Sequence, residues 1–295
     1  MTEMTPPTFP SPTDTSHAKP SVAALFEEYH WAKSSKNLDE WASYFDARTV
    51  YADATLGWYY PDRATWYDTV VEFVPRWGDG LSYATRVLGD DRSAVLAVTD
   101  SPELFGHEIR SLSAVDLVDG KIVRFVDYWD GRHFGAAATE GMRTTEGGRF
   151  QLGFGEETVE NLAPAKMTEL SYALSAALAR HDVDGVVALL AVDVVWEDMT
   201  LHGQILGRLA VARYLVRTGG GLPYAQQVRV VHVLGDDRGG GYEWRASDNH
   251  VPVGLVALEL DEHGLVTRFT TVWDGSLLPD DRMQRMTAWT LEPGA

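Results

Sequence analysis

The sequence has no cysteine, which excludes disulfides, thiolate nucleophiles and thiolate metal sites. It also lacks any run of about 18 apolar residues, the length that a membrane-spanning helix requires. Basic residues are few, because 25 Lys and Arg oppose 43 Asp and Glu and leave a net charge of −18. Such a chain repels phosphate backbones and anionic lipid, so we expect no nucleic acid and no membrane as partners. With no basic, apolar secretory signal at its start, the protein is predicted to be cytoplasmic.

What the sequence does contain is a long internal repeat. VLGDDR begins at residue 87 and again at residue 233, and FVDYWDG at residue 125 returns as FTTVWDG at residue 269. YADATL at residue 51 aligns with WEDMTL at residue 196. A spacing of about 145 residues is the length of a domain rather than of a solenoid unit. The chain is therefore predicted to be a duplicated domain.

Each copy begins with helical periodicity and ends with strand periodicity. In the first copy, helices are predicted from about residues 22, 38 and 62, and strands at 49–53, 81–89, 92–100, 107–118 and 121–129. In the second copy, helices are predicted from about residues 167, 183 and 207, and strands at 194–198, 223–235, 240–247, 250–261 and 264–273. Helices followed by a meander of antiparallel strands indicate an α+β domain.

Composition sets the expected domain limits. A Pro-, Ser- and Thr-rich stretch at residues 1–20 is predicted to be a disordered tail, and a Gly- and Ala-rich stretch at 134–164 a linker. These leave two domains, at 21–133 and 165–278, followed by a C-terminal tail at 279–295. We expect the two domains to pack as an intrachain pseudo-dimer.

The run HDVDGVVALLAVDVVWEDMTLHG at residues 181–203 resembles the opening of the SnoaL-like and ketosteroid-isomerase-like families of the NTF2-like superfamily. NLDEWASYFDARTVYADATLG at 37–57 is similar to the same pattern, more loosely. The resemblance implies two tandem cone-shaped domains, each with three helices packed in a curved antiparallel sheet around an apolar pocket. Such families include ring cyclases, isomerases, epoxide hydrolases, dehydratases and binding proteins, so the fold alone selects no reaction.

Asp53 and Asp198 end the first predicted strand of each copy. Their position resembles that of the family's general-base aspartate, and a carboxylate facing an apolar pocket has its pKa raised toward a useful value. The alternative is an aspartate that caps the following turn. Both residues are candidate catalytic groups.

Two histidines are candidates by strand alternation. His107 and His250 fall on the apolar face of the third strand of each meander. A neutral imidazole there would shuttle a proton near pH 7 or orient a carboxylate. The alternative is a buried histidine with a structural role.

The last strand and first helix distinguish the copies. Arg124 and Arg268 mark the outward face of the last strand, so Asp127 points inward and is replaced by Thr271 in the second copy. Asp127 is a candidate acid, or else the partner of a neighbouring histidine. Tyr29 resembles the phenol donor of ketosteroid isomerases, while the second copy has Leu174 there. The two pockets are therefore expected to be unequal.

Aromatic residues complete the set. The candidate substrate-binding residues are Tyr51, Trp58, Trp129, Trp196, Trp244 and Trp273. The alternative is that these aromatic residues only pack in the hydrophobic core. No spacing resembles a metal site and no cofactor motif is present, so we expect cofactor-free acid/base chemistry. The expected reaction is cyclisation or isomerisation of an apolar polyketide- or terpenoid-like molecule. The alternatives are epoxide hydrolysis or epoxide-opening cyclisation, and non-catalytic binding of a small molecule.

Overall fold

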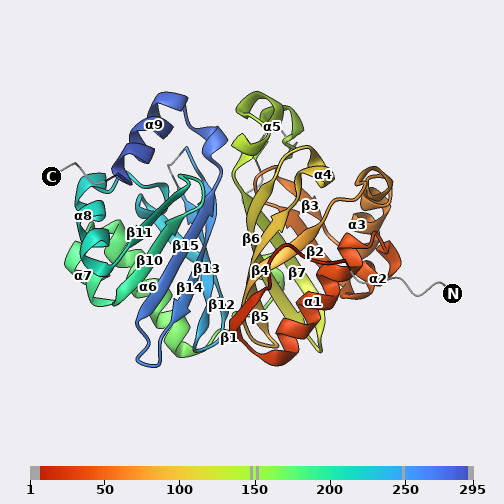
Figure 1. Cartoon of the computed structure of the whole chain (residues 1–295), viewed down its shortest axis with the longest axis horizontal. Helices are drawn as coiled ribbons and strands as arrows, with labels where there is room; N and C mark the ends of the chain where they lie inside the picture. The colour runs from red at the N-terminus through yellow and green to blue at the C-terminus, as the bar shows by residue number, and fades with distance from the viewer. Residues whose placement is uncertain (1–6, 147–148, 151–152, 248–249, 292–295) are drawn as a thin grey trace.

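Two large β-sheets of the protein face each other, and helices cover the outer side of each (Figure 1). The structure is a computed structural model that describes residues 7–146, 149–150, 153–247 and 250–291. Within those ranges, no helix has both the length and the apolar character needed to cross a bilayer.

The first domain holds one seven-stranded sheet. Its helices are α1 (Pro20–Ser34), α2 (Leu38–Ser43), α3 (Arg63–Val70) and α4 (Pro102–Phe105). Its strands are β1 (Asp14–Ala18), β2 (Phe45–Asp53), β3 (Trp58–Tyr60), β4 (Ser82–Gly89), β5 (Ser93–Asp100), β6 (Ile109–Val118) and β7 (Lys121–Trp129). They lie in the order β1-β4-β5-β6-β7-β2-β3, and β2 runs parallel to β7.

The second domain repeats this arrangement. Its helices are α6 (Ala165–Ala179), α7 (Val183–Ala188), α8 (Arg208–Thr218) and α9 (Asp280–Trp289). Its strands are β10 (Leu190–Asp198), β11 (Gly203–Leu206), β12 (Val228–Gly235), β13 (Gly239–Ala246), β14 (Val253–Leu260) and β15 (Val266–Trp273). The order β11-β10-β15-β14-β13-β12 matches the first sheet without β1, and β10 runs parallel to β15. The predicted α+β class is confirmed.

The repeat extends to local structure. The side chain of Asn37 caps α2 by accepting a hydrogen bond from the Glu40 N–H, and Asp182 caps α7 by accepting one from the Gly185 N–H. Such caps satisfy N–H groups that the first helical turn leaves without partners. The short edge strands β3 and β11 were not predicted, because three or four residues give too little alternation to recognise.

Each sheet has one face toward its helices and the other toward the second sheet. Along β7, Phe125 packs in the helix-side core, while Val126 and Tyr128 join the cluster between the sheets. The alternation is therefore as predicted, but the outward face does not meet solvent. Arg124, expected to mark that face, is fully buried between the sheets and donates to Glu243 at 2.8 Å.

Ion pairs related by the repeat join the sheets. Arg86 of β4 donates to Glu259 of β14 at 3.0 Å, and the equivalent residue His232 of β12 lies 2.8 Å from Asp116 of β6. Burial disfavours the charged imidazole, but the hydrogen bond and charge of Asp116 outweigh it and raise the pKa of His232. The two domains are thus held by partners that are equivalent in position and different in chemistry.

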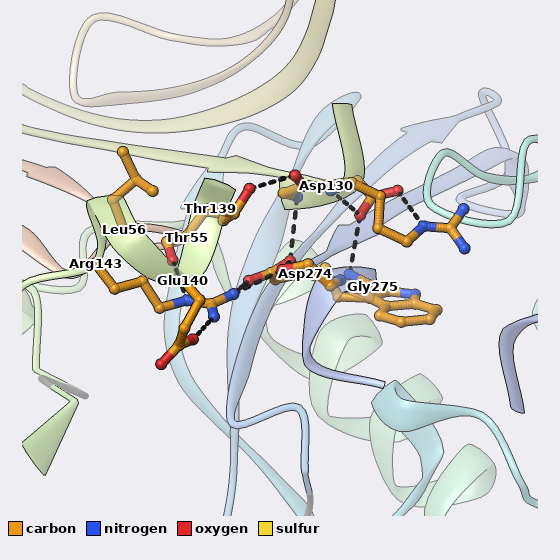
Figure 2. A network of polar contacts seen from close by, with 12 residues as sticks. Thr55, Leu56, Asp130, Thr139, Glu140, Arg143, Asp274 and Gly275 are labelled. Atoms are coloured by element: carbon orange, nitrogen blue, oxygen red, sulfur yellow. Dashed lines mark hydrogen bonds and ion pairs between the residues drawn. The ribbon is translucent and has the colours of Figure 1, made fainter. Parts of the chain in front are cut away.

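The WDG repeat lies at the contact between the domains. Asp130 accepts a hydrogen bond from the Gly275 N–H, Asp274 accepts one from the Gly131 N–H, and both distances are 3.1 Å. Figure 2 shows this reciprocal pair, with Arg143 of the connecting segment donating to Asp274. The motif therefore recurs because each copy contacts the other through it.

The VLGDDR repeat lies at the same contact. Gly89 and Gly235 have φ of +123° and +103°, conformations that glycine adopts without strain. A Cβ on Gly89 would stand 3.2 Å from the Gly235 Cα, and the Gly235 N–H donates to Ser93 Oγ at 2.8 Å. A Cβ on either glycine would first meet its own hairpin, at 2.3 Å from Ser93 O for Gly89 and 2.3 Å from Gly239 O for Gly235.

Three predicted irregular segments contain regular structure. Residues 14–18, expected in a disordered tail, form β1, because the edge of β4 offers unpaired backbone groups to which they hydrogen-bond in parallel. The predicted linker contains α5 (Ala136–Met142) and the hairpin β8 (Thr145–Glu146) with β9 (Arg149–Phe150). The predicted C-terminal tail forms α9, whose buried Met283 and Met286 complete the second core.

Replacing Gly131 by alanine is expected to destabilise the protein by about 1–3 kcal/mol. The added Cβ would lie 2.5 Å from Thr139 Cγ2 and 2.8 Å from Asp274 Oδ1, so the domain contact must shift. Gly141→Ala is the control, because its Cβ meets nothing within 4 Å and α5 gains a better helix former. Urea unfolding measures both, and equal stability of the two variants would contradict the assignment of Gly131 to a tight contact.

Candidate active site in the first domain

The first domain encloses a cavity of about 300 Å³ between its sheet and its helices. Half of the lining residues are aromatic, and they are Trp41, Tyr51, Trp58, Tyr60, Trp66, Phe73, Trp77, Phe105, Trp129 and Phe134. Its polar groups are few and come mainly from strand ends. An apolar cavity with a few convergent polar groups is typical of a small-molecule site.

Two carboxyl groups lie side by side in this cavity. Asp53 at the end of β2 is the register partner of Asp127 in the parallel strand β7, and both side chains line the cavity. Neighbouring strands are about 4.8 Å apart, and register partners in a parallel pair point to the same face. The sheet therefore places two acids next to each other at one wall.

Asp53 accepts three N–H hydrogen bonds. Trp129 Nε1 donates to Oδ2 at 2.9 Å, and the backbone N–H groups of Thr55 and Leu56 donate to Oδ1 at 2.9 and 2.8 Å. Burial nevertheless raises the pKa of Asp53 to about 7, and the charge of Asp127 adds to the rise. Asp53 can therefore gain or lose a proton near neutral pH.

Asp127 is held by two hydroxyl groups. Tyr51 donates to Oδ2 at 2.6 Å and Ser113 donates to Oδ1 at 2.5 Å. Burial raises the pKa of Asp127, while the charge of Lys33 and these two hydrogen bonds oppose the rise. Tyr51 was predicted as a substrate-binding residue, and it contacts both the cavity and the acid.

An ion pair that lines the same cavity was missed in the sequence. Lys33 Nζ lies 3.2 Å from Asp100 Oδ1, and both side chains line the cavity. A signal was available, because Lys33 follows Tyr29 by four residues and so shares its helix face. Asp100 ends β5, but nothing near it in the sequence indicated a partner.

Tyr29 lies beneath the cavity rather than on its wall. Its ring is 2% exposed and stacks on Phe125 at 5.8 Å, with Trp41 at 6.0 Å. Burial raises its pKa well above the usual value. The structure therefore places this candidate donor in the aromatic core that supports the site.

The two candidate histidines do not point into the pockets. The strands begin only at Ile109 and Val253, so His107 and His250 precede them in loops and are exposed. The prediction applied the alternation of side chains to residues that precede each strand, where the backbone is not pleated and alternation does not hold. His107 does contact Phe134, a lining residue, with ring centroids 5.2 Å apart.

Large side chains fill the equivalent region of the second domain. Trp196 replaces Tyr51 and stacks on Phe269 with centroids 3.7 Å apart. Trp244 takes the place of Val98, and a Cβ on its neighbour Gly254 would lie 2.4 Å from the Trp244 ring. With Trp273, these predicted substrate-binding residues are at most 1% exposed and belong to the core.

Asp198 keeps the environment of Asp53 in this filled interior. It accepts from the Leu201 N–H at 3.0 Å and from Trp273 Nε1 at 3.3 Å, and burial raises its pKa to about 7. Its register partner is Thr271, which donates to the Leu255 carbonyl instead of forming an acid pair. Trp58 and Trp129, by contrast, line the open cavity of the first domain.

No three His, Cys, Asp or Glu side chains gather to hold a metal ion in the part of the chain that the structure describes. The groups available for chemistry at the cavity are the adjacent carboxyl groups of Asp53 and Asp127, a third carboxyl group at Asp100, phenols, hydroxyl groups and one ammonium.

Each domain is a mostly antiparallel sheet packed against helices, and polar groups converge inside the first. Residues 172–274 match the family model described as a SnoaL-like domain. The first domain repeats the strand order and the landmark motifs of the second. The second domain is thus similar to a SnoaL-like domain, and the first domain repeats its strand order.

Solved structures resemble one domain at a time. A putative ketosteroid isomerase from Kribbella flavida is 21% identical over 49% of this chain and 91% of its own, with a TM-score of 0.32. A steroid delta-isomerase from Pseudomonas aeruginosa is 18% identical over 44% and 93%, with a TM-score of 0.34. A putative SnoaL-like polyketide cyclase from Shewanella putrefaciens is 13% identical over 42% and 88%, with a TM-score of 0.36. No curated protein matches the chain.

Asp198→Asn is expected to weaken the dependence of stability on pH. The folded pKa of about 7 exceeds the ordinary value of 3.8, so the stabilising contribution is complete below pH 3.8 and is lost as the pH rises through about 7. Between about pH 5 and pH 8, the wild type should lose about 2–3 kcal/mol more than the variant. Urea unfolding at both pH values measures this, with exposed Asp193→Asn on the same strand as control. Parallel losses in wild type and Asp198→Asn would contradict the assignment.

Proposed function

We propose that the first domain is a cofactor-free acid/base enzyme that isomerises or cyclises an apolar carbonyl compound. The observation that carries this proposal is the Asp53–Asp127 pair on one wall of an aromatic cavity. The coarser class agrees with the SnoaL-like family, whose folds support isomerase and cyclase chemistry.

The acid pair supplies both a base and an acid. Two adjacent buried carboxyl groups do not both ionise readily, so near neutrality they hold about one proton between them. The ionised member removes a proton from the carbon next to the substrate carbonyl, which leaves an enolate. The resulting carboxylic acid then returns a proton at a different carbon in isomerisation. In cyclisation, the enolate carbon instead attacks an electrophilic carbon of the same molecule, and the proton goes to the oxygen formed there.

Tyr51 links the pair to the cavity. When Asp127 is ionised, the phenol donates to it, as the 2.6 Å distance indicates. When Asp127 is protonated, its own proton can donate to the phenol oxygen, and the phenol proton can turn to the substrate. The phenol can thus pass on the protonation state of the acid without a change of position.

The cavity limits the substrate. A volume of about 300 Å³ lies at the lower end of the range for drug-sized ligands, so a molecule with one or two rings fits best. Aromatic walls favour a flat apolar body.

Epoxide opening is the second candidate, because it needs the same pair of one ionised and one protonated carboxyl group. The acid would protonate the epoxide oxygen while the carboxylate deprotonates the attacking water or hydroxyl. The product distinguishes the two reactions, since hydrolysis adds an oxygen atom from water and isomerisation does not.

Asp53→Asn and Asp127→Asn are each expected to reduce turnover by about 10²–10⁴-fold, the usual contribution of a positioned acid or base. The assay follows a cyclic β,γ-unsaturated ketone in D₂O, with NMR detecting hydrogen exchange and absorbance detecting conjugation. Asp198→Asn is the matched control and should leave the rate unchanged, because it lies in the filled domain. Full turnover by both first-domain variants would rule out the acid pair. Tight binding by the wild type without exchange would favour a binding protein.

The rate should depend on pH through Asp53. Because burial raises its pKa to about 7, kcat/KM for proton abstraction is expected to increase as the pH rises through about 7. In Asp53→Asn this inflection should disappear from whatever activity remains. An unchanged inflection in that variant would assign the titration to another group.

A further inference from the structure

The proposed chemistry of the acid pair gives no role to Lys33 and Asp100, which form an ion pair in the wall of the same cavity. Lys33 is the only Lys, Arg or His among the described lining residues, and its side chain is 12% exposed. Asp100 is 13% exposed. Holding two charges at a mostly apolar wall requires compensation, which the 3.2 Å contact supplies only in part.

Asp100 leaves most of the ammonium group available. An ammonium has three N–H donors, and the hydrogen bond to Asp100 uses one. Within the described residues, the other two have no hydrogen-bond partner. The Trp41 ring, whose centroid is 5.6 Å from Nζ, supports the cation from one side. The charge of Lys33 also opposes the rise in the pKa of Asp127 that burial causes.

The second domain shows that the fold does not need this pair. Leu178 stands at the position of Lys33 in α6, and Ala246 stands at the position of Asp100 in β13. Asp127 is replaced in the same domain by Thr271. The domain without the open cavity thus lacks all three charges, while it has the equivalents of Asp53 and Trp129.

We propose that Lys33, positioned by Asp100, binds the carbonyl oxygen of the substrate and stabilises the enolate oxygen that forms when the acid pair removes a proton. This assignment rests on the proposed function and specifies its substrate as one whose oxygen reaches Lys33 while its acidic C–H reaches Asp53 or Asp127. A cation at a water-poor wall stabilises a developing oxyanion far more than it would in water.

A phenol tests this role without turnover, because its oxyanion resembles an enolate. On binding, the phenol O–H bond gives its proton to the carboxylate pair or to solvent, and the phenolate oxygen stays at Lys33. 4-Nitrophenol is the probe, since its ionised form absorbs at a longer wavelength than its neutral form, and nitrobenzene is the neutral comparison. We expect the wild type to bind 4-nitrophenol at least about tenfold more tightly than nitrobenzene and to raise its ionised fraction.

The double variant Lys33→Leu/Asp100→Ala copies the second domain and leaves no buried charge without its partner. It should remain folded, lose the preference for 4-nitrophenol and still bind nitrobenzene. Lys33→Arg should restore part of the preference, whereas Lys121→Met, at an exposed strand end, should behave as the wild type. The same preference and ionised fraction in the wild type and the double variant, or no binding of 4-nitrophenol by the wild type, would overturn the assignment.

This experiment separates the two proposals. If Asp53→Asn and Asp127→Asn abolish exchange while the double variant binds both probes as the wild type does, the acid pair stands and Lys33 has no role at the oxygen. If the double variant loses the preference while both acid variants turn over fully, the oxygen site stands and the proposed chemistry fails.

Discussion

The face-to-face packing of the two sheets is the constraint on which the rest of the structure depends. Small and branched side chains such as Ala114, Val126 and Leu255 allow the sheets to approach closely. Between them lies the fully buried Arg124, paired with Asp116 of its own domain and Glu243 of the other. Removing one partner of a buried ion pair typically costs about 3–5 kcal/mol, so these charges fix the relative position of the domains while the apolar contacts supply the attraction. Each sheet is thereby held rigid behind its own helices, and the acid pair is built on that rigid wall.

The sequence repeat has a physical explanation in this packing. WDG and VLGDDR are the best-matched parts of the two copies, and both lie where the copies meet. In the WDG contact the same groups stand on both sides, so a change in one copy alone would leave a buried N–H or carboxylate without its partner. The residues around the cavity have no such requirement. They have diverged, and Asp127 with Lys33 and Asp100 remains in one copy only.

Much of the fold could be predicted from the sequence, because helix and strand periodicities are local and the repeat allowed each copy to check the other. The inward position of Asp127 followed from alternation within a strand, and its location next to Asp53 required the parallel pairing of β2 and β7, which no local pattern shows. The two histidines were misplaced because the start of a strand depends on backbone pairing rather than on residue type. Arg124 lies on the outward face of its sheet, as alternation predicted, but its complete burial depends on the second sheet, which no local pattern shows.

Successive side chains along a strand point to opposite faces of the sheet, so residues on one face can differ between the copies while those on the other face stay the same. On β13, Glu243 serves the contact between the domains, and the adjacent Trp244 points the other way and fills the interior. A cavity can thus be closed residue by residue on one face while the shared contact is preserved on the other. Because both domains belong to one chain, the second domain cannot dissociate from the first or be exchanged. It therefore supports the first domain through their contact whether or not its own interior holds a cavity.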